Sequence, residues 1–161
     1  MKKFLFLFLI LFAHFSLAQT DKINPKTPPT KDIFFKKENT PNAAPTQKIK
    51  QIHSDSINRK PDLYGGNMFF DGNVEFQHNG AVLTANRVVF YQKENFVKAI
   101  GNVVLVTSDG NRITAEEMEY DGETQRGIAR KNVVLTDPKQ TISTDILYYD
   151  RVKNTAYFNS G

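Results

Sequence analysis

The sequence predicts an all-β domain that is built from a repeat of about 30 residues. Short runs rich in Val, Ile, Phe and Tyr are separated by turn-forming pairs such as Asn79-Gly80, and no run keeps a helical period. The segments that begin at Asn73, Asn102 and Asn132 also align with one another, at offsets of 29 and 30 residues. We therefore expect the copies to stack as antiparallel strands, in the manner of a solenoid.

Residues 1–18 have the layout of a secretory signal peptide. Two lysines precede an apolar run from Phe4 to Phe15, and the small residues Ser16 and Ala18 suit cleavage after Ala18. The alternative is an uncleaved anchor, but the run is shorter than the roughly 20 apolar residues that span a bilayer. The chain has no cysteine, which excludes a lipoprotein anchor and disulfide chemistry. We expect an exported protein.

Residues 19–62 are expected to form a flexible polar linker, because they are rich in Lys, Pro, Thr, Asn and Gln. The apolar cluster Ile33-Phe34-Phe35 is the exception, and it either stays solvated or docks on the domain or on a partner. Residues 19–60 carry nine Lys and Arg against four Asp and Glu, whereas residues 61–161 carry ten against thirteen. The folded part is mildly acidic, which argues against a nucleic-acid-binding protein.

The repeat domain is expected to span residues 63–161. Each copy has a strand, a tight turn, a longer strand, a second turn and a short closing strand, and the turn chemistry stays in register through the copies. An alanine three residues before each asparagine closes the copy and marks a close approach of two layers. The first turns are Asn79-Gly80, Asp109-Gly110 and Asp137-Pro138, the second turns are at 93–95, 121–123 and 151–153, and the closing alanines are Ala99, Ala129 and Ala156.

Positions that stay apolar in every copy predict the inward face of the strands, because side chains alternate between the two faces. Together these side chains form a continuous apolar strip along the stack. The strip is either a solid core or, if the layers splay, a groove in which an acyl chain gains about 0.8 kcal/mol per buried CH₂. The candidate lipid-binding residues are Val74, Phe76, Leu83, Val88, Phe90, Val103, Leu105, Ile113, Met118, Tyr120, Val133, Leu135, Ile142, Leu147 and Tyr149.

No residue pattern points to catalysis, to a metal or to a cofactor. His14, His53 and His78 are far apart in the sequence and do not suggest a metal site. The carboxylates between Glu116 and Asp121 suggest paired acid and base groups, but the aligned positions of the other copies tolerate Asn, Arg, Val and Tyr. No Gly-x-Ser-x-Gly elbow and no glycine-rich phosphate loop occurs. We expect a protein that is not an enzyme.

The motifs Gly72-Asn73-Val74, Gly101-Asn102-Val103, Tyr120-Asp121-Gly122 and Leu147-Tyr148-Tyr149-Asp150 resemble those of the organic-solvent-tolerance (OstA-like) or lipopolysaccharide-transport protein A family. The resemblance covers about residues 63–161. It implies a twisted β-jelly roll in the periplasm of a Gram-negative envelope. It also implies an apolar groove that carries lipopolysaccharide towards the outer membrane, which favours the groove over the plain core.

The resemblance implies two kinds of partner, and it leaves alternatives open. The partners are lipopolysaccharide or a related lipid, and other jelly-roll transport proteins or a second copy, joined by edge strands. The sequence stops at Asn159-Ser160-Gly161 as a fourth copy begins, so either the chain is a fragment or another chain completes its edge. The alternatives are a solid-core β-solenoid that acts through assembly, the N-terminal domain of a larger outer-membrane assembly barrel, and a carbohydrate-active repeat enzyme.

Overall fold

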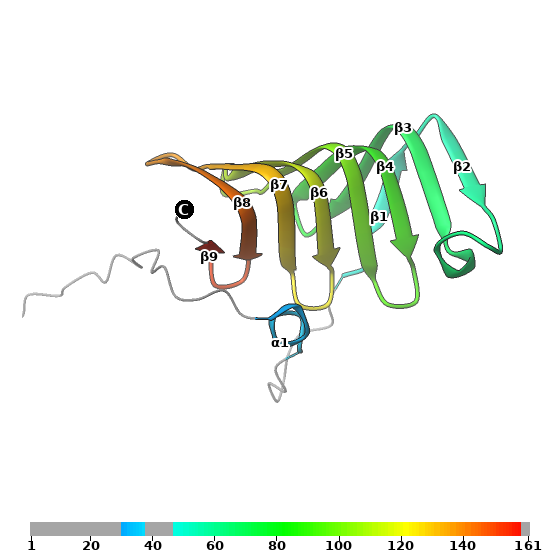
Figure 1. Ribbon diagram of the computed structural model, residues 1–161, viewed down its shortest axis with the longest axis horizontal. Coiled ribbons are helices and arrows are strands. Elements are labelled where there is room, and N and C mark those ends of the chain that lie inside the picture. Colours follow the sequence, from blue (N-terminus) through cyan, green and yellow to red (C-terminus); the bar gives the residue numbers. More distant parts are fainter. Residues whose placement is uncertain (1–29, 38–46, 159–161) are drawn as a thin grey trace, which may run out of the picture.

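The computed structural model describes residues 30–37 and 47–158, so the predicted signal peptide lies outside the described residues. These residues form a nine-stranded antiparallel sheet with the order β1-β3-β4-β5-β6-β7-β8-β9, and β2 also pairs with β3. The predicted all-β class is confirmed. Figure 1 shows a twisted stack that runs from β2 at one end to β9 at the other. The elements are α1 (Lys31–Phe34), β1 (Lys50–His53), β2 (Ser56–Arg59), the 3-10 helix η1 (Tyr64–Gly66), β3 (Met68–His78), β4 (Ala81–Tyr91), β5 (Phe96–Val106), β6 (Arg112–Asp121), β7 (Arg126–Thr136), β8 (Thr141–Asp150) and β9 (Thr155–Phe158).

Each long strand bends near its middle, where the register with the next strand shifts. In β3, β5 and β7 the bend lies at two consecutive residues with positive φ, namely 72–73, 101–102 and 131–132. These are the Gly-Asn positions of the first two copies and Lys131-Asn132 of the third. The sequence predicts a strand start at each asparagine, and this is wrong. The closing strand of one copy and the opening strand of the next form one bent strand of 11 residues.

The bends fold the sheet into two layers that face each other. Phe76, from the second half of β3, packs edge-on against Phe70 and Phe90, with ring centroids 5.2 and 5.4 Å apart. Most of the buried side chains lie between the layers. We call residues 56–59, 68–71, 87–91, 96–100, 117–121, 126–130, 146–150 and 155–158 layer I, and residues 50–53, 74–78, 81–85, 103–106, 112–115, 133–136 and 141–144 layer II.

The domain boundary predicted at residue 63 is corrected by two strands that precede it. β1 pairs with the layer II half of β3, and β2 pairs with the layer I half. Asp55, between them, donates its backbone N–H to the carbonyls of Asp71 and Gly72 at the bend. These strands form a sheet edge, so their backbone is paired on one side while most of their polar side chains stay in water. The rest of the predicted linker, residues 19–29 and 38–46, lies outside the described residues.

α1 docks on the outer surface of layer I (Figure 1), as one of the alternatives for Phe34 and Phe35 predicts. Phe34 is buried with Ile128 and Tyr148, and its ring meets Tyr148 edge-on at 5.2 Å. The guanidinium of Arg126 lies 5.8 Å from the Phe34 ring centroid and donates to the Phe34 carbonyl at 3.0 Å. A four-residue helix is not stable alone, so these contacts hold it.

Candidate functional site

The structure brings all the predicted inward residues into one apolar cluster between the layers. Their exposed fractions are 8% or less, except that Ile142, in the last full strand, is partly buried. The bends explain why Leu83 and Val88 both point inward although they are five residues apart. The register of β4 with β5 shifts between Thr84 and Arg87, so the alternation changes phase there and resumes with Val88 and Phe90.

The sequence reasoning missed several members of this cluster. Val97 is fully buried and pairs in register with Phe90 and Tyr120 on the two neighbouring strands. Its alternation with Ala99 in the short closing strand was the available signal. Ile49 also belongs to the cluster but comes from the predicted linker, where Lys48 and Lys50 flank it, and no pattern marks it. Phe70, Ala81, Ala85 and Ala115 are further members.

Among the described residues, the two layers pack closely against each other, because nearly all the inward side chains are buried. One cavity among these side chains, near Ile49, Phe76, Leu105 and Tyr120, has a volume of only about 10 Å³. A space of that size holds one water molecule at most. An acyl chain therefore fits between the layers only if they move apart.

The two long sides of the stack are closed by different means. On one side, the bent strands run continuously from layer I into layer II. On the other side, the turns of layer I face the turns of layer II, and polar side chains join them. We call this second side the seam; it comprises His78, Asn79, Asn95, Asn111, Tyr120, Tyr149, Arg151 and Asn154 together with Gln47.

His78, Tyr120 and Arg151 form the first seam contact. His78 Nε2 lies 2.8 Å from the carbonyl of Gln47, so that nitrogen carries the proton. Nδ1 then accepts from the Tyr120 hydroxyl at 2.9 Å. Arg151 donates to the Tyr120 hydroxyl at 2.9 Å, and to the carbonyls of Asn79 and His78 at 3.0 and 3.3 Å. Burial lowers the pKa of His78, and the charge of Arg151 adds to this effect; burial also raises the pKa of Tyr120.

Asn111, Tyr149 and Asn154 form a second seam contact. Asn111 lies before β6 in layer II and donates to the Tyr149 hydroxyl at 2.8 Å and to Asn154 Oδ1 at 3.1 Å. The Tyr149 hydroxyl in turn donates to Asn154 Oδ1 at 3.0 Å. Burial raises the pKa of Tyr149. Tyr120 and Tyr149 therefore each place an apolar ring inside and a hydroxyl at the seam.

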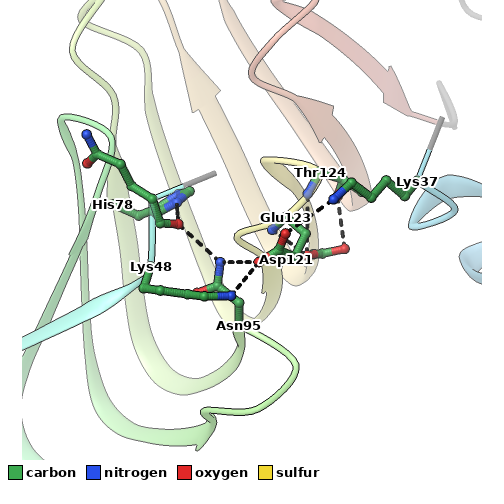
Figure 2. A network of polar contacts seen from close by, with 8 residues as sticks. Lys37, Lys48, His78, Asn95, Asp121, Glu123 and Thr124 are labelled. Carbon is green, nitrogen blue, oxygen red and sulfur yellow. Dashed lines mark hydrogen bonds and ion pairs between the residues drawn. The ribbon is translucent and has the colours of Figure 1, made fainter. Parts of the chain in front are cut away.

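Residues 47–49 cover one part of the seam, and Asn95 holds them there (Figure 2). The Asn95 amide accepts from the backbone N–H of Ile49 at 2.8 Å and donates to the Gln47 carbonyl at 3.2 Å. It also donates to Glu123 Oε1 at 3.1 Å, and Lys48 reaches the same carboxylate oxygen at 2.8 Å. These polar contacts hold residues 47–49 across the seam, and the side chain of Ile49 packs into the apolar interior beneath them.

Two of the carboxylates between Glu116 and Asp121 form ion pairs on the outer face of layer I. Lys131 pairs with Glu117 at 2.7 Å and lowers the pKa of that carboxyl. Burial acts to raise the pKa of Glu119, but Lys31 at 2.6 Å and Arg130 at 3.0 Å outweigh it and lower the pKa. In the part of the chain that the structure describes, no group of three or more His, Cys, Asp or Glu residues could hold a metal ion. Among the same residues, no helix has the length and hydropathy to cross a membrane.

A profile of the OstA-like protein family matches residues 46–161, a range that includes every strand of the described sheet. The chain belongs to the OstA-like protein family. Over 82 residues, 51% of its length, this OstA-like chain is 32% identical to the LPS-assembly protein LptD of Polaromonas sp. (strain JS666 / ATCC BAA-500). The match spans only 10% of that LptD.

A solved structure has the same fold as this OstA-like chain. It is LptH, the LptA-homologous periplasmic component of the lipopolysaccharide transport device of Pseudomonas aeruginosa, with a TM-score of 0.61 at 16% identity. The superposition covers 71% of this chain and 84% of LptH. The sheet is thus an LptA-like β-jelly roll, as the sequence resemblance predicts.

Proposed function

We propose that the chain is a periplasmic component of lipopolysaccharide transport that shields acyl chains between its two layers. One observation carries the proposal: an apolar interior runs without interruption through all the copies of the repeat. The family and the likeness to LptD and LptH support lipopolysaccharide, or a related lipid, as the cargo. The signal peptide expected at residues 1–18 supports export to the periplasm of a Gram-negative envelope, at or near the outer membrane.

Lipid shielding of this kind needs no catalytic group. An acyl chain that leaves water gains about 0.8 kcal/mol per buried CH₂, and the inward side chains offer an apolar surface on both layers. The lipid competes with the contact that the layers make with each other, which keeps the interior dry between cargoes. Charged groups such as Glu117 and Glu119 lie in ion pairs on the outer surface, away from that path.

We also propose that sheet edges join the chain to other jelly-roll domains or to a second copy. Within the described residues, the Thr141–Thr144 half of β8 has no strand on the side away from β7, because β9 pairs only with residues 147–150. β1 and β2 form the edge at the other end. An unpaired edge offers backbone donors and acceptors to an incoming strand, and the interior would then continue from one domain into the next.

Adjacent side chains on one strand give a matched test of the cargo site. Leu105 points inward and is 2% exposed, whereas its neighbour Val106 points outward and is 40% exposed. A photo-crosslinking residue at Leu105 or Phe76 should capture lipopolysaccharide, and one at Val106 or Gln77 should not. Equal capture at inward and outward positions would contradict the proposal.

The closed interior favours a second candidate function, a solid-core solenoid that acts only by assembly with other β domains. This candidate predicts that no lipid copurifies with the chain and that none is captured at Leu105. It also predicts that assembly through the edge strands proceeds equally well with and without lipopolysaccharide. Capture of lipid at Leu105 but not at Val106 would rule this candidate out.

A further inference from the structure

We propose that acyl chains enter the interior sideways through the seam, and that Arg151 there exchanges backbone carbonyls for the anionic head of the lipid. The inference rests on the proposed function. It specifies the route by which the lipid enters the interior and the residue that binds the polar head of the lipid. Within the described residues the stack has two ends and two long sides, so a chain can enter from an end or through a side. The structure distinguishes the two sides sharply.

The bent side cannot open without breaking strands. There, β3, β5 and β7 pass from layer I to layer II through two residues each, at 72–73, 101–102 and 131–132. Side chains across neighbouring strands reinforce the bends. Asn73 donates to Asp55 at 3.1 Å, and Asn102 donates to Asn86 at 3.4 Å. We call this bent side the spine; it is the hinge about which the two layers can move apart.

The seam is held by side chains alone, as far as the described residues show. Backbone hydrogen bonds between turns run along layer I rather than across the seam, from Gly122 to Asn95 at 2.8 Å and from Arg151 to Gln125 at 3.1 Å. The contacts across it come from side chains such as His78, Asn111 and Arg151. Opening the seam therefore leaves the strand pairing of both layers intact.

Arg151 is suited to receive the polar head because of what it binds in the closed state. The hydrogen bonds described for its guanidinium end on uncharged oxygens: the carbonyls of His78 and Asn79 and the hydroxyl of Tyr120. A phosphate or carboxylate is a stronger acceptor for a guanidinium than a neutral oxygen. When the seam opens, Arg151 loses its hydrogen bonds to these oxygens, and the anionic head of the lipid supplies new acceptors for the guanidinium. Its acyl chains lie inward, beneath the rings of Tyr120 and Tyr149.

A reversible covalent cross-link across the seam tests this route. The chain has no native cysteine, so a cross-linker that reacts with thiols modifies only the introduced cysteines. Asn111 and Asn154 touch across the seam at 3.1 Å. The N111C/N154C variant, linked by a short bis-methanethiosulfonate, should lose labelling by lipopolysaccharide that carries a photoreactive acyl chain, and reductant should restore it. The control V104C/T114C joins register partners within layer II, and its linked form should label like the unlinked chain.

Each outcome of the lock experiment has one meaning. If the locked seam variant is labelled as strongly as the locked control, chains enter through the ends of the stack and the inference is wrong. If no form is labelled, including the unmodified chain and the reduced variants, the proposed function itself fails.

The role of Arg151 is tested separately with two lipid probes, one with an anionic head and one with an uncharged head. The R151M variant should bind lipopolysaccharide more weakly than the control R112M, which removes an exposed arginine of β6. Both variants should bind a diacylglycerol, which has an uncharged head, equally well. Equal binding of lipopolysaccharide by R151M and R112M would overturn the head-group assignment, as would an equal loss of both probes in R151M.

Discussion

At the residue scale, the Gly-Asn-Val motif belongs to the bend of a strand. Gly101 has a φ of +78°, and a Cβ built there would lie 2.8 Å from Asn86 Nδ2. Asn102 follows with a φ of +47° and donates its side chain to Asn86. The sequence showed that these residues recur, but recurrence alone does not distinguish the start of a strand from a bend within one. Backbone conformation and the cross-strand contact together explain why glycine and asparagine occur there.

Substitution of Gly101 by alanine should therefore destabilise the domain through both strain and a clash. We expect a loss of about 1–3 kcal/mol in the free energy of unfolding, measured with denaturant. The control is G110A, because Gly110 has a φ of +89° but a Cβ there meets no atom within 4 Å. G101A should lose more stability than G110A, and equal losses would show that the contact with Asn86 does not matter.

His78 should make stability depend on pH. Its pKa is lowered below the usual 6.5, mainly by burial. The charge of Arg151 adds to the shift, whereas the hydrogen bond to the Gln47 carbonyl and the charges of Glu123 and Asp121 oppose it. The unfolded chain then binds more protons than the folded chain in the window just below pH 6.5, so stability falls as the pH falls through that window. Denaturant titrations at several pH values should show this slope for the native chain. The H78Q variant should lose the slope, and an unchanged slope would refute the assignment.

At the scale of elements, the turns and the phase of the strands in the repeat follow the sequence closely. Turns at Asn79-Gly80 and Asp109-Gly110 connect β3 to β4 and β5 to β6, as predicted. β1, β2 and α1 escaped prediction for a physical reason. β1 and β2 pair at a sheet edge, so their sequences show neither an apolar run nor a clear alternation. α1 overlaps the apolar cluster Ile33-Phe34-Phe35, but it is too short to show a helical period, and the residues that stabilise it lie far away in the chain.

Removal of the Phe34 ring should undock α1 from layer I. Phe34 is 5% exposed and contacts Ile128, Tyr148 and Arg126. The F34A variant should lose about 3 kcal/mol of unfolding free energy, at the lower end of the range for buried aromatic residues. Hydrogen exchange should show lost protection around Ile128. The control V152A alters a side chain that is 68% exposed and should change neither measurement. Native-like protection in F34A would mean that α1 is not held by this ring.

At the scale of the whole molecule, the repeat gives two layers, one covalent spine and one polar seam. The predicted inward residues all lie in the apolar interior, because inward positions keep their character in every copy, but members such as Ile49 and Val97 were not predicted. The closed state was not predictable, since periodicity is the same for a solid core and for a splayed groove. The seam was also hidden in the sequence. Its residues come from turns as far apart as Gln47 and Arg151, and only the folded chain brings them together.

The distance between the layers tests the central claim most directly. A cavity of about 10 Å³ cannot hold an acyl chain, so a loaded interior requires separated layers. Spin labels at Val106 in layer II and at Val152 in a turn of layer I lie on opposite sides of the seam, and both positions are exposed. Double electron–electron resonance should show a longer distance when lipopolysaccharide is bound, while labels at Lys93 and Val152, both in layer I turns, keep theirs. An unchanged distance across the seam, with lipid shown to be bound, would contradict the account.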